Sequence, residues 1–224
     1  MRSPVVFVVA LFLSSFAFAA SKPHVINFGK PMQVKLFLGP SENHTVEINI
    51  RSLFVDTKLR EFTTGDPHDV TDRLFVVRRA FRINDGLPTE PRKPPKWLWQ
   101  LGGWLLVDRS TGRVTQLVLP EFDPFYSDVA WYRDYAAYCG INENATKVFA
   151  VVTAIGRKKP ILRRELAAAT NGPHRDSECD VPTWERNPAK VTFNPKNAQK
   201  LTFTLPDRSV AVLPAGEEES SKEQ

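Results

Sequence analysis

Apolar residues recur at every second position through much of this chain. The alternation runs over residues 32–36 and returns over residues 46–50, with a turn-forming stretch, 39–43, between them. A period of two residues is typical of a strand with one buried face. The glycine, proline, serine and asparagine of the intervening stretch favour chain reversal. The pattern predicts a β-hairpin over residues 31–51.

Further strands follow from patterns of the same kind. Residues 72–83 carry apolar side chains on both faces, which is typical of a strand in the middle of a sheet. Two apolar runs within residues 104–119 flank a turn, where Gly112 can adopt a positive φ angle. This stretch predicts a second hairpin.

The C-terminal half also favours strands. They are expected at 135–139, 147–154 and 159–166 and in the apolar stretches between 191 and 213. Only residues 163–169 have a helix-forming composition, and the Asn-Gly-Pro sequence at 171–173 would end such a helix within a turn or two. The predicted fold class is mainly β, an antiparallel sandwich or a partial propeller-like assembly with at most one short helix.

The predicted organisation is a single mainly-β domain over residues 20–213. Residues 85–96 are rich in proline, which lacks the N–H group that a sheet ladder needs. This stretch is therefore a connection or, as an alternative, a boundary between two subdomains. Residues 214–224 are polar and acidic, and we expect them to form a disordered tail.

Residues 1–19 have the organisation of a signal peptide. Arg2 precedes an apolar run, Val5–Phe18, that is short for a membrane span. Ala17 and Ala19 are the small residues that signal peptidase accepts, so we predict cleavage after Ala19 and export to the periplasm or the extracellular space. The alternative is an uncleaved anchor. No later stretch looks membrane-spanning.

The chain has two cysteines, Cys139 and Cys179. Disulfides persist in the compartments to which a signal peptide leads, so we expect these two residues to pair. Closing a loop of this length would stabilise the fold by about 4 kcal/mol. The alternative is a nucleophilic thiol at Cys139 with His174 as its base, although no thiol-enzyme motif surrounds it.

Three runs carry a resemblance to other proteins. Residues 69–79, 102–109 and 119–124 resemble an uncharacterised family of exported bacterial proteins. That resemblance implies a periplasmic or secreted protein and implies no chemistry. Separately, the segment from Trp131 to Glu165 resembles a single blade of a β-propeller.

The most unusual composition lies in residues 121–138, the aromatic–acidic segment, where aromatic rings interleave with carboxylates. Rings with polar edges stack on sugars, and carboxylates bind hydroxyl groups or a hard cation. The alternative is that the rings fill a core and the acids cap turns, as Asp123 before Pro124 would. The candidate ligand-binding residues are Phe122, Asp123, Tyr126, Asp128, Trp131, Tyr132 and Asp134.

A second small polar group consists of Asp66, His68, Asp69 and Asp72. These residue types suit a metal ion, but the neighbouring glycine and proline favour turn and strand-start contacts instead. Basic residues gather separately, at 78–82, 92–96 and 157–164.

If the basic stretches meet in space, they would attract polyanions through salt-sensitive contacts. For an exported protein, cell-wall polymers and anionic lipid headgroups suit such a surface better than nucleic acid, which we do not expect as a partner.

Motifs for common enzyme chemistry do not occur. The sequence has no glycine-rich phosphate loop, no zinc-protease motif and no serine-hydrolase motif. We therefore assign no catalytic residue, no cofactor and no metal site. The predicted function is an exported binding or envelope-associated scaffold module, with a saccharide or an envelope protein as its partner. The alternative is a hydrolase of envelope saccharides that uses carboxylates of the aromatic–acidic segment.

Overall fold

The structure is a computed structural model that describes residues 23–37, 45–84, 97–168, 179–196 and 198–205. The predicted signal peptide, the proline-rich stretch and the acidic tail lie outside these ranges. Within them the regular structure consists of β-strands, which confirms the mainly-β fold class. This part of the chain also contains no helix of the length and apolarity that a membrane span needs.

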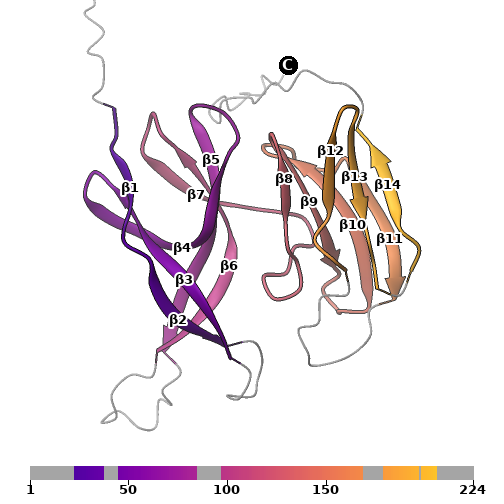
Figure 1. The fold of residues 1–224 in the computed structure, drawn as a ribbon, viewed down its shortest axis with the longest axis horizontal. Helices are drawn as coiled ribbons and strands as arrows, with labels where there is room; N and C mark the ends of the chain where they lie inside the picture. The colour runs from indigo at the N-terminus through magenta and orange to yellow at the C-terminus, as the bar shows by residue number, and fades with distance from the viewer. Residues whose placement is uncertain (1–22, 38–44, 85–96, 169–178, 197, 206–224) are drawn as a thin grey trace, which may run out of the picture.

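The strands form two lobes, one from β1–β7 and the other from β8–β14 (Figure 1). In chain order they are β1 (Ile26–Phe28), β2 (Met32–Phe37), β3 (Thr45–Val55), β4 (Lys58–Asp69), β5 (Leu74–Asn84), β6 (Trp97–Asp108), β7 (Arg113–Leu117), β8 (Ala130–Tyr132), β9 (Tyr135–Ile141), β10 (Lys147–Ala154), β11 (Leu162–Ala168), β12 (Thr183–Arg186), β13 (Ala189–Phe193) and β14 (Leu201–Thr204).

The first lobe is a sheet that closes on itself. The strands from β2 to β6 pair in chain order, and β2 also pairs with β6, in parallel, at Leu36 and Trp99. β1 adds to β3, and β7 adds to β6. Alternate residues of the central strands β5 and β6 face the interior, as a period of two requires. The buried cluster there consists of Leu53, Phe75, Val77, Leu105 and Val107.

The second lobe is a sandwich of two antiparallel sheets, β11-β10-β9-β8 and β12-β13-β14. Residues on one face of β9 and β10, such as Ala137 and Val152, pack with Phe193 of β13 in a buried core. A disulfide joins Cys139 of β9 to Cys179, in the segment that leads into β12. The predicted pairing of the two cysteines is confirmed.

The opposite face of β9 and β10 packs against the first lobe. Tyr138, Phe149 and Val151 on this face share a buried cluster with Val76 and Trp104 of the first lobe. Both strands therefore bury both faces, which accounts for their nearly continuous apolar sequences. We call this shared core the lobe junction.

The strand pairings of both predicted hairpins are confirmed, and the turn-forming stretch 39–43 of the first lies outside the described residues. β2 pairs with β3 across residues 31–51, and β6 pairs with β7 around a turn in which Gly112 has a φ of 64°. β5 lies between β4 and β6, as its two apolar faces predict.

Two local features differ from the sequence-based expectation. Most of the helix-forming stretch 163–169 lies in β11, because its backbone pairs with β10. The turn-like stretch 65–67 lies inside β4, where the pairing with β5 is irregular between Thr64 and His68 and Gly65 has a φ of 70°. Residues that favour a turn here form a bulge within one strand.

Candidate functional site

The aromatic–acidic segment begins by crossing from the first lobe onto the sheet of the second. The carbonyl oxygen of Glu121 accepts a hydrogen bond from the N–H of Ile141 (2.9 Å), and the Tyr138 hydroxyl donates to the carbonyl oxygen of Pro120 (2.6 Å). Gly140 permits this approach, because an added Cβ would lie 2.8 Å from the Glu121 carbonyl oxygen. The start of the segment is fixed to the sheet by these contacts.

Asp123 and Ser127 hold a tight turn. The Asp123 carboxylate accepts a hydrogen bond from the N–H of Phe125 (2.6 Å), and the Asp123 carbonyl oxygen accepts one from the N–H of Ser127 (2.8 Å). The buried Ser127 hydroxyl in turn donates to the carbonyl oxygen of Cys139 (2.8 Å). Asp123 thus makes the turn-capping contact that the sequence offered as the alternative to ligand binding.

Phe122 and Trp131 pack into the lobe junction. Phe122 meets the Tyr138 ring edge to face, with centroids 5.6 Å apart. Trp131 meets Trp104 of the first lobe in a similar way at 5.1 Å, and the His68 ring stacks on Trp131 at 5.8 Å. These two candidate residues lie in contacts between the lobes.

Glu121 is held by an ion pair with Arg163 of β11. Both of its carboxylate oxygens lie within 3.0 Å of the Arg163 Nε atom. The same guanidinium lies 4.0 Å from the centroid of the Phe149 ring. This acid therefore joins the crossing segment to the edge strand of the sheet.

Tyr132 points to the other side of the sheet from Trp131 and lies at the end of the sandwich. Its ring centroid is 5.4 Å from that of Trp184 on β12, and the Tyr135 ring lies 6.5 Å from the same indole. The Arg133 guanidinium carbon lies 5.3 Å from the centroid of the Tyr132 ring. The three rings are partly exposed and Arg133 is exposed, so this group reaches solvent.

Asp134 is buried beneath this group, with 5% of its surface exposed. Burial raises the pKa of its carboxyl above the ordinary value, and the charges of Arg133 and Arg157 oppose part of that rise. Arg133 lies in the turn between β8 and β9, and Arg157 lies in the loop between β10 and β11. Basic groups from two different hairpins therefore lie at the same end of the sheet.

Lys158 and Lys159 follow Arg157 in the same loop and are exposed. We call the whole group the aromatic–basic rim. It consists of Tyr132, Arg133, Tyr135, Arg157, Lys158, Lys159 and Trp184.

Only Tyr132 of the rim was among the candidate binding residues predicted from the sequence. The basic run at 157–164 gave a signal for the cations, whereas nothing in the sequence connects Trp184 with Tyr132. Of the other candidates, Tyr126 is partly exposed and Asp128 is exposed, both in the loop before β8.

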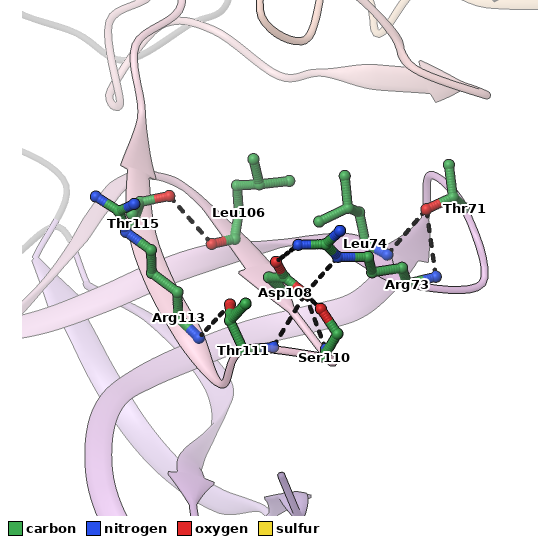
Figure 2. Close-up of polar contacts among 9 residues, drawn as sticks. All are labelled: Thr71, Arg73, Leu74, Leu106, Asp108, Ser110, Thr111, Arg113 and Thr115. Atoms are coloured by element: carbon green, nitrogen blue, oxygen red, sulfur yellow. Dashed lines mark hydrogen bonds and ion pairs between the residues drawn. The ribbon is translucent and has the colours of Figure 1, made fainter. Parts of the chain in front are cut away.

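A second polar group lies at the turn between β6 and β7 (Figure 2). The Asp108 carboxylate accepts hydrogen bonds from Arg73 Nε (2.9 Å), from the Ser110 N–H (2.8 Å) and from the Ser110 hydroxyl (2.7 Å). These contacts, the one with Arg73 above all, hold the pKa of Asp108 well below its ordinary value. The Thr71 hydroxyl oxygen accepts a hydrogen bond from the N–H of Leu74 (3.0 Å). Because these contacts close turns or join strands, we assign this group a structural role.

Three of the four residues considered for a metal ion have separate side-chain partners. Asp66 pairs with Arg51 (3.0 Å), and Asp69 pairs with Arg109 (2.6 Å). The His68 Nε2 atom bonds a main-chain carbonyl oxygen of the second lobe (2.8 Å). In the part of the chain that the structure describes, no three histidine, cysteine or acidic side chains are grouped so as to hold a metal.

The alternative role of Cys139 as a nucleophile is wrong, because its sulfur is bonded to Cys179. Both cysteines are buried. His174, the base considered for it, lies outside the described residues.

No family model matches the chain, and neither a curated protein nor a solved structure matches it. The fold and the site define its class as a two-lobed, all-β protein with a disulfide in its second lobe. The chemistry of the aromatic–basic rim is the basis for assigning a function.

Proposed function

We propose that the protein is an exported binding module that takes an anionic saccharide on the aromatic–basic rim. The observation that carries this proposal is that Arg133 lies against the Tyr132 ring, which contacts Trp184, while the loop that holds Arg157 leaves β10 at the same end of the sheet. Partly exposed aromatic rings provide a flat apolar surface on which a sugar ring can stack. Guanidinium groups bind carboxylates and other planar anions through two parallel hydrogen bonds.

The distribution of acids near the rim favours an anionic ligand. Asp134, although it lies within the segment, is only 5% exposed, so its carboxyl group is not presented to a ligand at the surface. Lys158 and Lys159 add two exposed cations to the same end of the sheet. The rim therefore combines positive charge with stacking surfaces, which together suit an acidic sugar polymer better than a neutral one.

Export is supported by two observations of different kinds. The sequence of residues 1–19 is typical of a signal peptide. The disulfide between Cys139 and Cys179 suits an oxidising compartment. An acidic polymer of a cell envelope is a ligand that such a protein would meet.

Two of the carboxylates considered for a hydrolase make structural contacts. Glu121 binds Arg163, and Asp123 caps a turn. Neither contact favours the hydrolase over the binding module.

The test is isothermal titration of the oxidised protein with a uronic-acid oligosaccharide and with a neutral oligosaccharide of the same length. We expect the acidic ligand to bind more tightly and to lose affinity as salt is added. The double substitution Arg133→Gln and Arg157→Gln should weaken binding by about tenfold or more, because two charge-assisted contacts are lost. Tyr132→Ala should weaken it through the loss of stacking.

Arg113→Gln is the matched control, since Arg113 is an exposed arginine of the first lobe. It should leave the affinity unchanged. Equal binding of the acidic and neutral ligands, or unchanged affinity in the double variant, would contradict the proposal.

A further inference from the structure

Four buried side-chain polar atoms gather at the lobe junction. They are Nε1 of Trp104, Nε1 of Trp131, Oδ1 of Asp134 and Oγ1 of Thr153, and none has a hydrogen-bond partner among the described residues. Trp104 is 9% exposed, Asp134 5% and Thr153 2%. Folded proteins pair nearly all buried polar atoms, either with protein groups or with ordered water. Such atoms indicate hydrogen-bond partners other than the groups that the structure describes.

Strand register places two of these side chains, those of Trp131 and Thr153, on one face of the sheet. Trp131 pairs with Ala136, and Ala136 pairs with Thr153, so these residues form a row across β8, β9 and β10. Asp134 lies next to this row, in the two-residue turn between β8 and β9. Its carbonyl oxygen accepts a hydrogen bond from the N–H of Ile155 (3.0 Å), which continues the ladder. Within the row, Ala136 contributes only a methyl group between the two polar side chains.

Trp104 approaches this row from the first lobe. Its ring centroid lies 5.1 Å from that of Trp131, and the two ring planes are inclined at 71°. One indole N–H group therefore comes from each lobe, while the hydroxyl and the carboxylate come from the second lobe. Buried polar groups without a hydrogen-bond partner among the described residues therefore come from both lobes.

The chemistry of these groups selects the kind of molecule that fits between them. An indole N–H only donates, a carboxyl group accepts and, when it is protonated, also donates, and a hydroxyl does both. A bound ion of either sign would satisfy one part of this set and oppose the other. Water donates two hydrogen bonds and accepts two, and a buried water typically makes about three bonds to groups without a protein partner.

We propose that ordered water binds at this site in the lobe junction, bridging the indole N–H groups of Trp104 and Trp131 to the Asp134 carboxylate and the Thr153 hydroxyl. A water bound by groups from both lobes joins them much as a direct hydrogen bond would. The proposal does not depend on the function of the rim, because Trp104 and Trp131 pack in the lobe junction, whereas Tyr132 packs against Trp184.

The first test is Thr153→Val in the oxidised full chain, because valine has nearly the shape of threonine without its hydroxyl. If the hydroxyl binds water, the substitution removes a hydrogen bond and should lower Tm by about 2–4 °C. If the hydroxyl has no partner, the substitution replaces an unpaired polar atom with a methyl group and should raise Tm. A raised Tm would overturn the proposal.

Thr192→Val is the matched control. Thr192 is also a buried strand threonine, with 8% exposed, and its hydroxyl lies 3.0 Å from the Thr202 hydroxyl. This variant should lose Tm, which calibrates the effect of removing a satisfied hydroxyl in the same sandwich.

The second test uses the unmodified protein, so it does not depend on any variant folding. Water-selective NMR should show nuclear Overhauser effects from long-lived bound water to the indole N–H protons of Trp104 and Trp131. The Trp184 indole N–H, which donates to the carbonyl oxygen of Ala130 (3.0 Å), already has a protein partner and is the internal control, so its effect from long-lived water should be weaker. The absence of the effect at both junction indoles would overturn the proposal.

Discussion

Arg78 of β5 donates a hydrogen bond from its Nη2 atom to the carbonyl oxygen of Pro124, 2.9 Å away. Only 7% of the arginine is exposed, and its guanidinium carbon lies 4.9 Å from the centroid of the Phe122 ring. Withdrawing a charged group from water carries a large free-energy cost that only close polar contacts offset. Arg78 therefore ties the first lobe to the loop that leads into the second.

Replacing this arginine should weaken the joint between the lobes. We expect Arg78→Met to lower the free energy of unfolding by about 2–3 kcal/mol, because methionine keeps apolar contacts but leaves the Pro124 carbonyl oxygen without this donor. Urea unfolding of the oxidised protein measures the change. Arg113→Met, at an exposed position of β7, should change it by less than about 0.5 kcal/mol. Equal effects of the two variants would show that Arg78 does not join the lobes.

The disulfide should contribute a large share of the stability of the second lobe. Cys139 and Cys179 are separated by 40 residues, so their bond restricts a long loop of the unfolded chain. Replacing both by alanine should lower the free energy of unfolding by about 2–4 kcal/mol in urea titrations. The wild-type protein with a reducing agent should approach the stability of the variant. A variant as stable as the oxidised wild type would contradict this expectation.

Gly140 should tolerate no larger side chain, because the backbone of Glu121 crosses directly above it. An added Cβ would lie 2.8 Å from the Glu121 carbonyl oxygen and 3.2 Å from Val151 Cγ2. We expect Gly140→Ala to cost about 1–3 kcal/mol and to speed amide exchange at Ile141, which donates to that carbonyl.

Gly103→Ala provides the control for this effect. Gly103 is also a strand glycine, but its added Cβ would meet only the end of the Gln116 side chain, at 3.6 Å. The crossing of the segment over Gly140 would be contradicted if the two variants had the same stability.

Local patterns were sufficient to predict the hairpins, and the reason is physical. In the stretch 104–119 each strand pairs with its neighbour along the chain, so the alternation and the turn glycine together define the pairing. The closure of the first lobe depends instead on the pair Leu36 and Trp99, which lie far apart in the sequence. No local pattern encodes such a contact.

At the candidate site, too, local sequence patterns predicted the local contacts but not the contacts between distant parts of the chain. The Asp123–Pro124 sequence predicted a turn, and the structure has that turn. Trp131 and Tyr132 are adjacent aromatic residues that point to opposite faces, one into the lobe junction and one to the rim. Composition cannot distinguish them, because the face that each residue meets depends on how the two lobes pack.

Asp134 should make the stability of the protein depend on pH in a definite direction. Burial raises the pKa of its carboxyl above the ordinary value of 3.8, so the folded state holds a proton that the unfolded state releases first. Its contribution is therefore greatest below pH 3.8 and decreases as pH rises through the folded pKa. The nearby charges of Arg133 and Arg157 oppose part of the rise in the folded pKa. They therefore narrow the pH range over which this stability is lost, but they do not reverse the direction of the change.

Asp134→Asn removes this titration while keeping the shape and one oxygen acceptor. The variant minus wild-type difference in the free energy of unfolding should therefore become more favourable to the variant as pH rises from 4 to 7. Urea titrations of both proteins at several pH values measure this difference, and contributions of other titrating groups cancel in the subtraction. Asp128→Asn, at an exposed position of the same segment, should show a much weaker dependence. A difference between Asp134→Asn and wild type that stayed constant with pH would contradict this prediction. It would mean that the carboxyl has the same pKa in the folded and unfolded states, so that its burial does not change the free energy of ionisation.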